Sequence, residues 1–295
     1  MQVKDGIDGG LGGDMRRFSA SIRAFALAAP FILAPAMALA ADIGGYKDGG
    51  EPGSDWALAG VKVGGILVVQ PTYEGSDEYE VFGFPYILPQ FYGEPGFFGR
   101  IDARGADDVR FELFRHDGFI AGPLAGYKFG REEDDGDLLE GLGDIDDSFV
   151  AGGFAGYRWN QLLFDVSYHH YFGDVDGFQI RFGAEIERPV SERVTLTGRI
   201  GATYADENYT QVYFGISEEQ ADDSPFFSDP YDTDAGFKDV HAQLGIKADL
   251  DDRWSARASL RYSHLLGDAA DSPVVESEDQ FTGLFGLSYR FGLGE

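Results

Sequence analysis

The sequence predicts an all-β fold: a transmembrane antiparallel β-barrel of about twelve strands, closed by its C-terminal strand. Three observations support this class. Segments of about ten residues alternate apolar with polar side chains, and this is the length of a tilted strand that crosses a bilayer. The connections between these segments alternate short and long from Arg115 onward. Aromatic side chains gather near the segment ends, where membrane barrels carry their aromatic girdles.

The final segment shows this alternation clearly. Residues 281–293 have the sequence FTGLFGLSYRFGL, in which every second position from Phe281 is aromatic, aliphatic or glycine. The intervening positions are mostly small or polar. A strand sends alternate side chains to opposite faces, so one face suits lipid and the other suits the interior. We expect this strand to close the barrel by pairing with the first strand, at residues 57–69.

The expected strands follow in order along the chain. The second, at residues 81–92, contains Pro85 and Pro89, so we expect it to be irregular, bulged or only partly paired. Two short strands are expected at 97–104 and 109–115, although one bulged strand would also fit. Both termini of the barrel should lie on the same side of the membrane, so the strand number is even, and ten is the fallback. The remaining eight are expected at 119–129, 149–159, 162–172, 178–186, 194–204, 240–250, 254–264 and 281–293.

Composition restricts the function classes. The chain has 295 residues, of which 42 are Gly, 25 Phe and 15 Tyr, and its formal net charge is −28. Nucleic acid is not expected as a partner, because an acidic protein repels phosphates. The chain has no Cys, so it can form neither a disulfide nor a thiolate metal site. Its mean hydropathy of −0.21 does not suit a bundle of membrane helices.

The N-terminal region has the features of a secretory signal peptide. Residues 15–40 carry three arginines, then an apolar stretch, then Ala38-Leu39-Ala40. This is the pattern that precedes cleavage, here after Ala40. The translation start is expected at Met15, with residues 1–14 as an extension. An uncleaved membrane anchor is the alternative interpretation. Residues 41–55 would then form a flexible periplasmic lead-in, and residues 56–295 the barrel.

Two sets of barrel residues follow from the alternation. The first is an aromatic girdle near the strand ends, comprising Tyr157, Trp159, Tyr204, Trp254, Tyr289 and Phe291. The second is a network of charges of both signs on the inward face, which should form pairs or line water because unpaired buried charge is costly. Its members are Arg181, Arg199, Arg257, Arg261, Arg290, Lys247, Glu185, Glu187 and Asp249, with Lys128 and Asp165 beside them. Either a narrow aqueous lumen or a filled interior fits this pattern.

No catalytic or cofactor-binding residue is predicted. His169 and His170 are adjacent in a strand and should point to opposite faces. Asp165, Ser167 and His169 share a face, but same-face residues two apart are expected to be too distant for a nucleophile and its base. Several loops are acidic, and candidate oxygen ligands for a divalent cation are Asp134, Asp135, Asp137, Asp144 and Asp146. Solvated loops that bind no metal are the favoured interpretation.

Aromatic residues in the longest loop, residues 206–236, are expected to cap the barrel mouth, because exposed aromatic side chains favour burial. They are Tyr209, Tyr213, Phe214, Phe226 and Phe227.

Several stretches resemble the MipA/OmpV family of outer-membrane proteins, and the resemblance covers roughly residues 56–291. The most specific stretch is PTYEGSD at 71–77; the others are FPYILP at 84–89, residues 118–130 ending in GYKFG, residues 254–266 and residues 287–291. One feature departs from the pattern. Such barrels usually end on an aromatic residue, whereas Leu293-Gly294-Glu295 follow Phe291 here.

The resemblance implies a location in the bacterial outer membrane, in contact with lipid and lipopolysaccharide. It also implies a non-enzymatic scaffold that links a lytic transglycosylase and a murein synthase during peptidoglycan remodelling. Two other hypotheses stay open. One is a small cation-preferring pore, and the other is a surface adhesin that acts through the acidic loops at 131–147 and 206–236.

Overall fold

A computed structural model describes residues 58–91 and 101–292, which form thirteen strands in a single antiparallel sheet. The predicted signal peptide, the lead-in and residues 97–100 of the third expected strand lie outside this part. The strands are β1 (Leu58–Pro71), β2 (Tyr79–Phe91), β3 (Ile101–Gly105), β4 (Asp108–Phe111), β5 (Phe114–His116), β6 (Phe119–Lys128), β7 (Ser148–Trp159), β8 (Leu162–Phe172), β9 (Gly177–Pro189), β10 (Val194–Ala205), β11 (Gly236–Asp249), β12 (Trp254–Leu265) and β13 (Asp279–Gly292).

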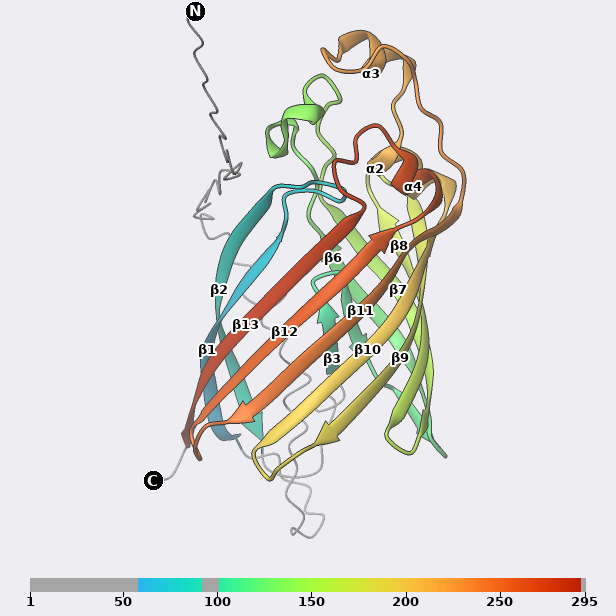
Figure 1. Ribbon diagram of the computed structural model, residues 1–295. Coiled ribbons are helices and arrows are strands. Elements are labelled where there is room, and N and C mark those ends of the chain that lie inside the picture. The colour runs from blue at the N-terminus through green and yellow to red at the C-terminus, as the bar shows by residue number, and fades with distance from the viewer. Residues whose placement is uncertain (1–57, 92–100, 293–295) are drawn as a thin grey trace, which may run out of the picture.

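The order of the strands confirms the barrel and its seam. Neighbouring strands run β2-β1-β13-β12-β11-β10-β9-β8-β7-β6-β4-β3, with β5 also paired to β6. The last strand pairs with the first, from Gly60 opposite Gly292 to Val69 opposite Gly283. The long strands are tilted and curve around a common interior (Figure 1).

The structure has thirteen strands in place of the expected twelve, because the segment at 109–115 breaks after residue 111. It forms β4 and β5 rather than one strand. Within the described residues, ten strands have 10 to 14 residues, enough to cross a membrane. Strand β2 pairs along its length with β1, and in the described part of the sheet β1 is its sole neighbour. Pro85 and Pro89 therefore lie in an edge strand, where a missing N–H is tolerated.

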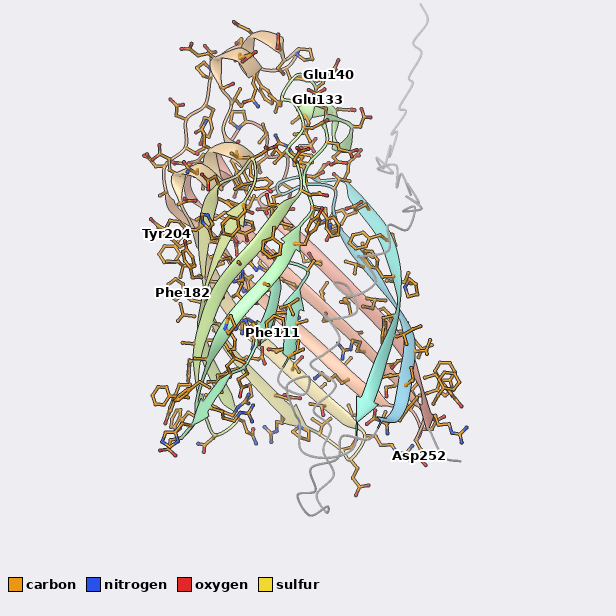
Figure 2. The ribbon with its side chains drawn as sticks, turned by 180° about the vertical axis from the view of Figure 1, so that it is seen from behind. Phe111, Glu133, Glu140, Phe182, Tyr204 and Asp252 are labelled. Atoms are coloured by element: carbon orange, nitrogen blue, oxygen red, sulfur yellow. The ribbon has the colours of Figure 1, made fainter. Side chains whose placement is uncertain are left out.

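The two faces of the wall differ in polarity as the alternation predicts. In β8, the side chains of Asp165, Ser167 and His169 are buried inside, whereas Phe164 and Tyr168 are exposed outside. Phe182 and Tyr204 likewise point away from the wall in Figure 2. An exposed apolar surface of this extent would be a liability in water but is the lipid-facing band of a membrane barrel.

The two ends of the barrel also differ. One end carries the long loops with their short helices, and Glu133 and Glu140 lie there in Figure 2, whereas Asp252 lies in a tight turn at the other end. We call these the loop end and the turn end. The helices are η4 (Glu133–Asp135), η5 (Asp137–Leu139), α2 (Glu207–Phe214), α3 (Glu218–Asp223) and α4 (Gly267–Asp271). Within residues 58–91 and 101–292, no helix is long and apolar enough to cross a membrane.

Close approach of two strands requires glycine at one inward position of β7. A Cβ added to Gly152 would lie 1.9 Å from the carbonyl oxygen of Tyr168 in β8, whereas one added to the next residue, Gly153, would lie 3.4 Å from its nearest neighbour. We expect Gly152→Ala to lower the stability of the folded barrel by about 1–3 kcal/mol, the usual cost of overpacking. Urea unfolding in detergent micelles measures this. Gly153→Ala is the matched control, and equal stability of the two variants would contradict the prediction.

Candidate functional site

The interior of the barrel contains a hairpin that joins the sheet of the wall through only two residue pairs, Val109 with Ala125 and Arg110 with Leu124 of β6. Strands β3 and β4 pair with each other at residues 101–111, and we call them the inner hairpin. Figure 1 shows β3 enclosed by the long strands. At the tip of the hairpin, the backbone N–H of Tyr127 donates to the carbonyl of Ala106 at 2.9 Å. The Asp107 carboxylate accepts from the hydroxyl of Tyr171 at 3.2 Å and forms an ion pair with Arg181.

The stem of the inner hairpin is held by ion pairs centred on Asp165 of β8. Its carboxylate accepts from the guanidinium groups of Arg199 at 2.7 and 3.0 Å and of Arg110 at 2.8 Å. A third guanidinium, that of Arg104, lies 3.3 Å away. Glu185 lies 3.4 Å from both Arg104 and Arg199, which brings a second negative charge to the cluster. The hairpin and the wall therefore neutralise each other's charges.

Ser167 and His169 correct one geometric expectation. The Oγ of Ser167 lies 2.9 Å from Nε2 of His169, so residues two apart on this strand do reach each other. The contact is nevertheless enclosed. Both side chains are at most 1% exposed, and Arg110 donates to the same Oγ at 3.0 Å. His170 points to the opposite face, where its ring lies 4.4 Å from that of Phe172. Both groups are therefore members of a buried hydrogen-bond network.

A second ionic centre lies nearer the loop end, around Glu74 in the turn between β1 and β2. Its carboxylate accepts from Lys128 of β6 at 2.8 Å, Lys238 of β11 at 2.6 Å and the Tyr209 hydroxyl of α2 at 2.7 Å. The ammonium of Lys128 also lies over the ring of Tyr213, 4.5 Å from its centroid. One carboxylate thus joins a turn, two strands on opposite parts of the wall and the helix above them.

The charges around Glu74 determine its protonation. Burial alone would raise the pKa of this carboxyl, but the two ammonium groups outweigh it and hold the pKa well below the ordinary value of 4.5. Burial, followed by the charge of Glu74, raises the pKa of the Tyr209 phenol well above its ordinary value. The carboxylate is therefore ionised and the phenol protonated near neutral pH, which are the forms that their hydrogen bond requires.

The loops cover the barrel mouth above this centre. Tyr209, Tyr213 and Phe214 are at most 5% exposed, packed with residues of the upper wall such as Tyr171 and Leu265. A second buried cluster joins the loops to one another, and its members are Tyr73, Leu139, Leu142, Ile216, Ala221 and Val274. Of the aromatic residues expected to cap the mouth, Phe226 instead stays exposed.

The inward charges named from the sequence fall into two groups. Those beside the inner hairpin are well paired, as described for Arg181, Arg199 and Glu185. The others form longer or solvent-exposed contacts. Arg261 lies 3.8 Å from Asp239, Lys247 lies 3.7 Å from Glu187, Asp249 accepts from Ser255, Arg257 lies beside Gly286, and Arg290 is exposed.

The residues at the centres of these contacts are not among those predicted from the sequence. They are Glu74, Arg104, Asp107, Asp108, Arg110 and Lys238. The sequence contains one indication of these residues. Asp102, Arg104, Asp108 and Arg110 place charge at every second position of two short strands, which suits a strand with a polar interior partner.

The acidic loop at 131–147 uses its carboxylates within itself. Asp135 accepts from the N–H of Glu132, Asp144 accepts from that of Glu133, and Glu133 accepts from that of Gly143. Asp134, Asp137 and Asp146 do not join them in a site. In the described part of the chain, no group of three or more acidic or histidine side chains is placed to hold a metal ion.

The residues of the predicted girdle lie at the strand ends. At the turn end, the ring of Trp254 lies 5.0 Å from that of Tyr289, which in turn lies 4.6 Å from Phe291. Tyr157 of β7 packs against Phe119, and Trp159 is exposed on the outside. At the loop end, Tyr204 packs edge-to-face with Phe237.

In comparison with known proteins, a family model matches most of the chain. The model of the family described as MltA-interacting protein MipA matches residues 63–291. The chain is 32% identical over 99 residues to the Escherichia coli K12 protein named "Putative outer membrane protein YiaT", covering 34% of this chain and 39% of that protein. It is 29% identical over 101 residues to the MltA-interacting protein of the same strain, covering 33% and 38%. These alignments span about two fifths of either relative's length.

Solved structures similar to the chain include two bacterial barrels. The translocator domain of the autotransporter NalP from Neisseria meningitidis has a TM-score of 0.37 and 10% identity, covering 88% of this chain and 95% of that one. The N-terminal barrel domain of Pseudomonas aeruginosa OprF has a TM-score of 0.26 and 13% identity, covering 60% and 100%.

The Glu74 centre yields a test of how the loop cap is held. In Glu74→Gln the ammonium groups of Lys128 and Lys238 lose their carboxylate, so we expect a loss of about 2 kcal/mol, as for hydrogen bonds to charged groups. Urea unfolding of the reconstituted barrel measures this. Glu140→Gln, at an exposed loop position, is the control and should leave stability unchanged within about 0.5 kcal/mol.

The pH dependence separates the charge of Glu74 from its packing. A carboxyl with a depressed pKa contributes stability that is complete above its ordinary pKa and is lost as the pH falls through the folded-state value. The difference between wild type and Glu74→Gln should therefore be constant above about pH 5 and shrink as the pH falls below 4.5. A difference that persists unchanged at pH 3 would show that the carboxylate charge is not responsible.

Proposed function

This chain belongs to the MipA family of MltA-interacting proteins, and we propose that it is a non-enzymatic scaffold of the outer membrane. Its proposed partners are enzymes that process murein: a lytic transglycosylase and, through it, a murein synthase. Support comes from the family match over residues 63–291 and from the relative named MltA-interacting protein. On this proposal, the barrel holds a binding surface in the membrane and performs no chemistry itself.

The observation that carries this proposal is the occupied interior. The inner hairpin is tied to two strands of the wall, β8 and β9, by Arg104, Arg110 and Asp107, and the loop cap is tied to the wall through Glu74. A transport pathway needs a continuous polar lumen, and an active site needs access to its nucleophile. The ion pairs and the cap occupy the upper interior. The surfaces outside the membrane are then the parts best placed to act.

The turn end is the proposed contact surface, because a partner that processes murein acts in the periplasm. Two of its turns are linked. Arg193, after β9, donates to the carbonyl of Leu250 at 3.2 Å and lies 3.6 Å from Asp252. The side chain of Asp252 is 98% exposed, and Glu192 is exposed beside it. Linked turns present a more rigid surface to a partner than independent loops would, which lowers the entropy lost on binding.

A binding experiment tests the scaffold. The mature chain, immobilised in detergent, should capture the purified lytic transglycosylase of its own organism, and the double variant Glu192→Lys with Asp252→Lys should bind roughly tenfold more weakly, a loss of about 1.4 kcal/mol. Biolayer interferometry gives both affinities. Glu140→Lys with Asp222→Lys introduces the same charge change at the loop end and is the control. Absence of binding by wild type, or equal weakening by both double variants, would reject the proposal.

A separate measurement distinguishes the scaffold from the cation-preferring pore. With the interior occupied, the reconstituted chain should show no steady conductance in a planar bilayer. A porin reconstituted under the same conditions is the positive control. A reproducible conductance that increases when Asp107→Ala with Arg181→Ala releases the hairpin tip would establish that the lumen conducts.

A further inference from the structure

One arginine is enclosed where the loop cap meets the wall. Arg131 follows β6, and its backbone pairs with Ile145 across the base of the acidic loop at 131–147. The residue is 4% exposed, and Nη1 of its side chain donates to the carbonyl of Tyr213 in α2 at 3.0 Å. Both Ile145 and Tyr213 belong to the buried cluster that joins the cap to the upper wall. The guanidinium therefore lies inside the junction rather than on its surface.

The charge of this guanidinium is not matched by a carboxylate. Among the residues that the structure describes, Nε of Arg131 has no hydrogen-bond partner, and no acidic side chain lies within 4.0 Å of the guanidinium. Residues 131–147 include nine acidic side chains, but most of these are exposed, where water and salt screen their charge. Burial is the largest influence on the pKa of Arg131 and lowers it below the ordinary value, whereas at Glu74 the opposite charges outweigh burial.

Other polar groups at the same junction also lack partners. The hydroxyl groups of Tyr213 and Ser148 are buried, and neither has a hydrogen-bond partner in the described residues. Ser148 lies opposite Lys128 in the ladder of β6 and β7, and the ammonium of Lys128 lies 4.5 Å from the centroid of the Tyr213 ring. Three of the five buried side-chain atoms without a partner in the described chain are therefore found where β6, β7 and α2 meet. Buried groups of this kind are normally satisfied by a bound water or ion.

A water molecule would satisfy these hydrogen bonds but would leave the charge of Arg131 without a counter-ion, which is costly in a buried position. Guanidinium N–H and phenol O–H groups can both donate to an anion. We infer that Nε of Arg131 and the hydroxyl of Tyr213 hold one small monovalent anion, of the size of chloride, between the cap and the wall. The ion neutralises Arg131 and fastens α2 to the end of β6. This site lies at the loop end and does not depend on the partner proposed for the turn end.

Exchange of the anion at constant ionic strength tests the site. An ion that binds only the folded chain stabilises it, so wild type in detergent should unfold about 3 °C or more higher in potassium chloride than in potassium gluconate of equal ionic strength. Arg131→Met removes the charge and keeps a long side chain, so it should abolish the difference. Arg115→Met is the matched control and should retain the difference, because Arg115 is exposed and donates to Glu112 at 2.8 Å. Equal unfolding temperatures of wild type in the two salts, or a difference that persists in Arg131→Met, would overturn the inference.

Crystallography locates the ion without a substitution. Crystals of wild type grown in bromide should show an anomalous scattering peak beside Nε of Arg131, because bromide can replace chloride in such a site. Tyr213→Phe removes one donor and keeps the ring that faces Lys128. It should therefore raise the chloride concentration that gives half of the stabilisation by roughly threefold or more, the loss of one hydrogen bond. Density without an anomalous signal, as water would give, or an unchanged chloride requirement in Tyr213→Phe would contradict the anion site.

Discussion

The hydrocarbon of a bilayer offers no hydrogen-bond partner, and this constraint determines how the polar side chains of this protein are arranged. A membrane wall must satisfy its backbone through neighbouring strands and present apolar side chains outward. Because side chains alternate along a strand, half of every strand then points inward. In β8 the inward positions hold Asp165, Ser167 and His169, all buried. Such groups require partners from within the same chain.

The inner hairpin supplies those partners. Asp165 alone would be a buried carboxylate with a large desolvation cost, yet it receives guanidinium groups from the hairpin and from β10. Arg181 is satisfied in the same way by Asp107 at the hairpin tip. In the interior, the charges of the wall and those of the inner hairpin thus neutralise one another. Breaking one member leaves the other charge buried, which typically costs about 3–5 kcal/mol, so the hairpin is energetically part of the barrel although only two residue pairs join it to β6 of the wall.

The wall is predictable from the sequence for a physical reason, and the interior is not. A period of two over ten residues reflects the strand geometry itself, so the long strands and the pairing of β1 with β13 follow from local pattern. Contacts such as Arg110 with Asp165 join residues 55 apart, and no local pattern specifies them. Local spacing can also predict a separation that the structure does not show, and Ser167 and His169 are the example. Ideal spacing predicts separation, whereas the side-chain rotamers in a packed interior bring the two groups to 2.9 Å.

The PTYEGSD segment shows how one short sequence can serve several of these requirements together. Tyr73 donates to the carbonyl of Val274 at 3.2 Å and packs among the loops, and Glu74 pairs with two lysines of the wall. Gly75 has a φ of 104°, and a Cβ there would lie 2.6 Å from Val275, so glycine is needed both for the backbone and for the contact. Ser76 is fully buried, and its Oγ accepts from the N–H of Glu78 at 3.0 Å. Each residue meets a different neighbour, so none can substitute for another. The specificity of this segment therefore follows from its position as the junction between wall, cap and loops, which is a structural role distinct from the partner binding proposed for the turn end.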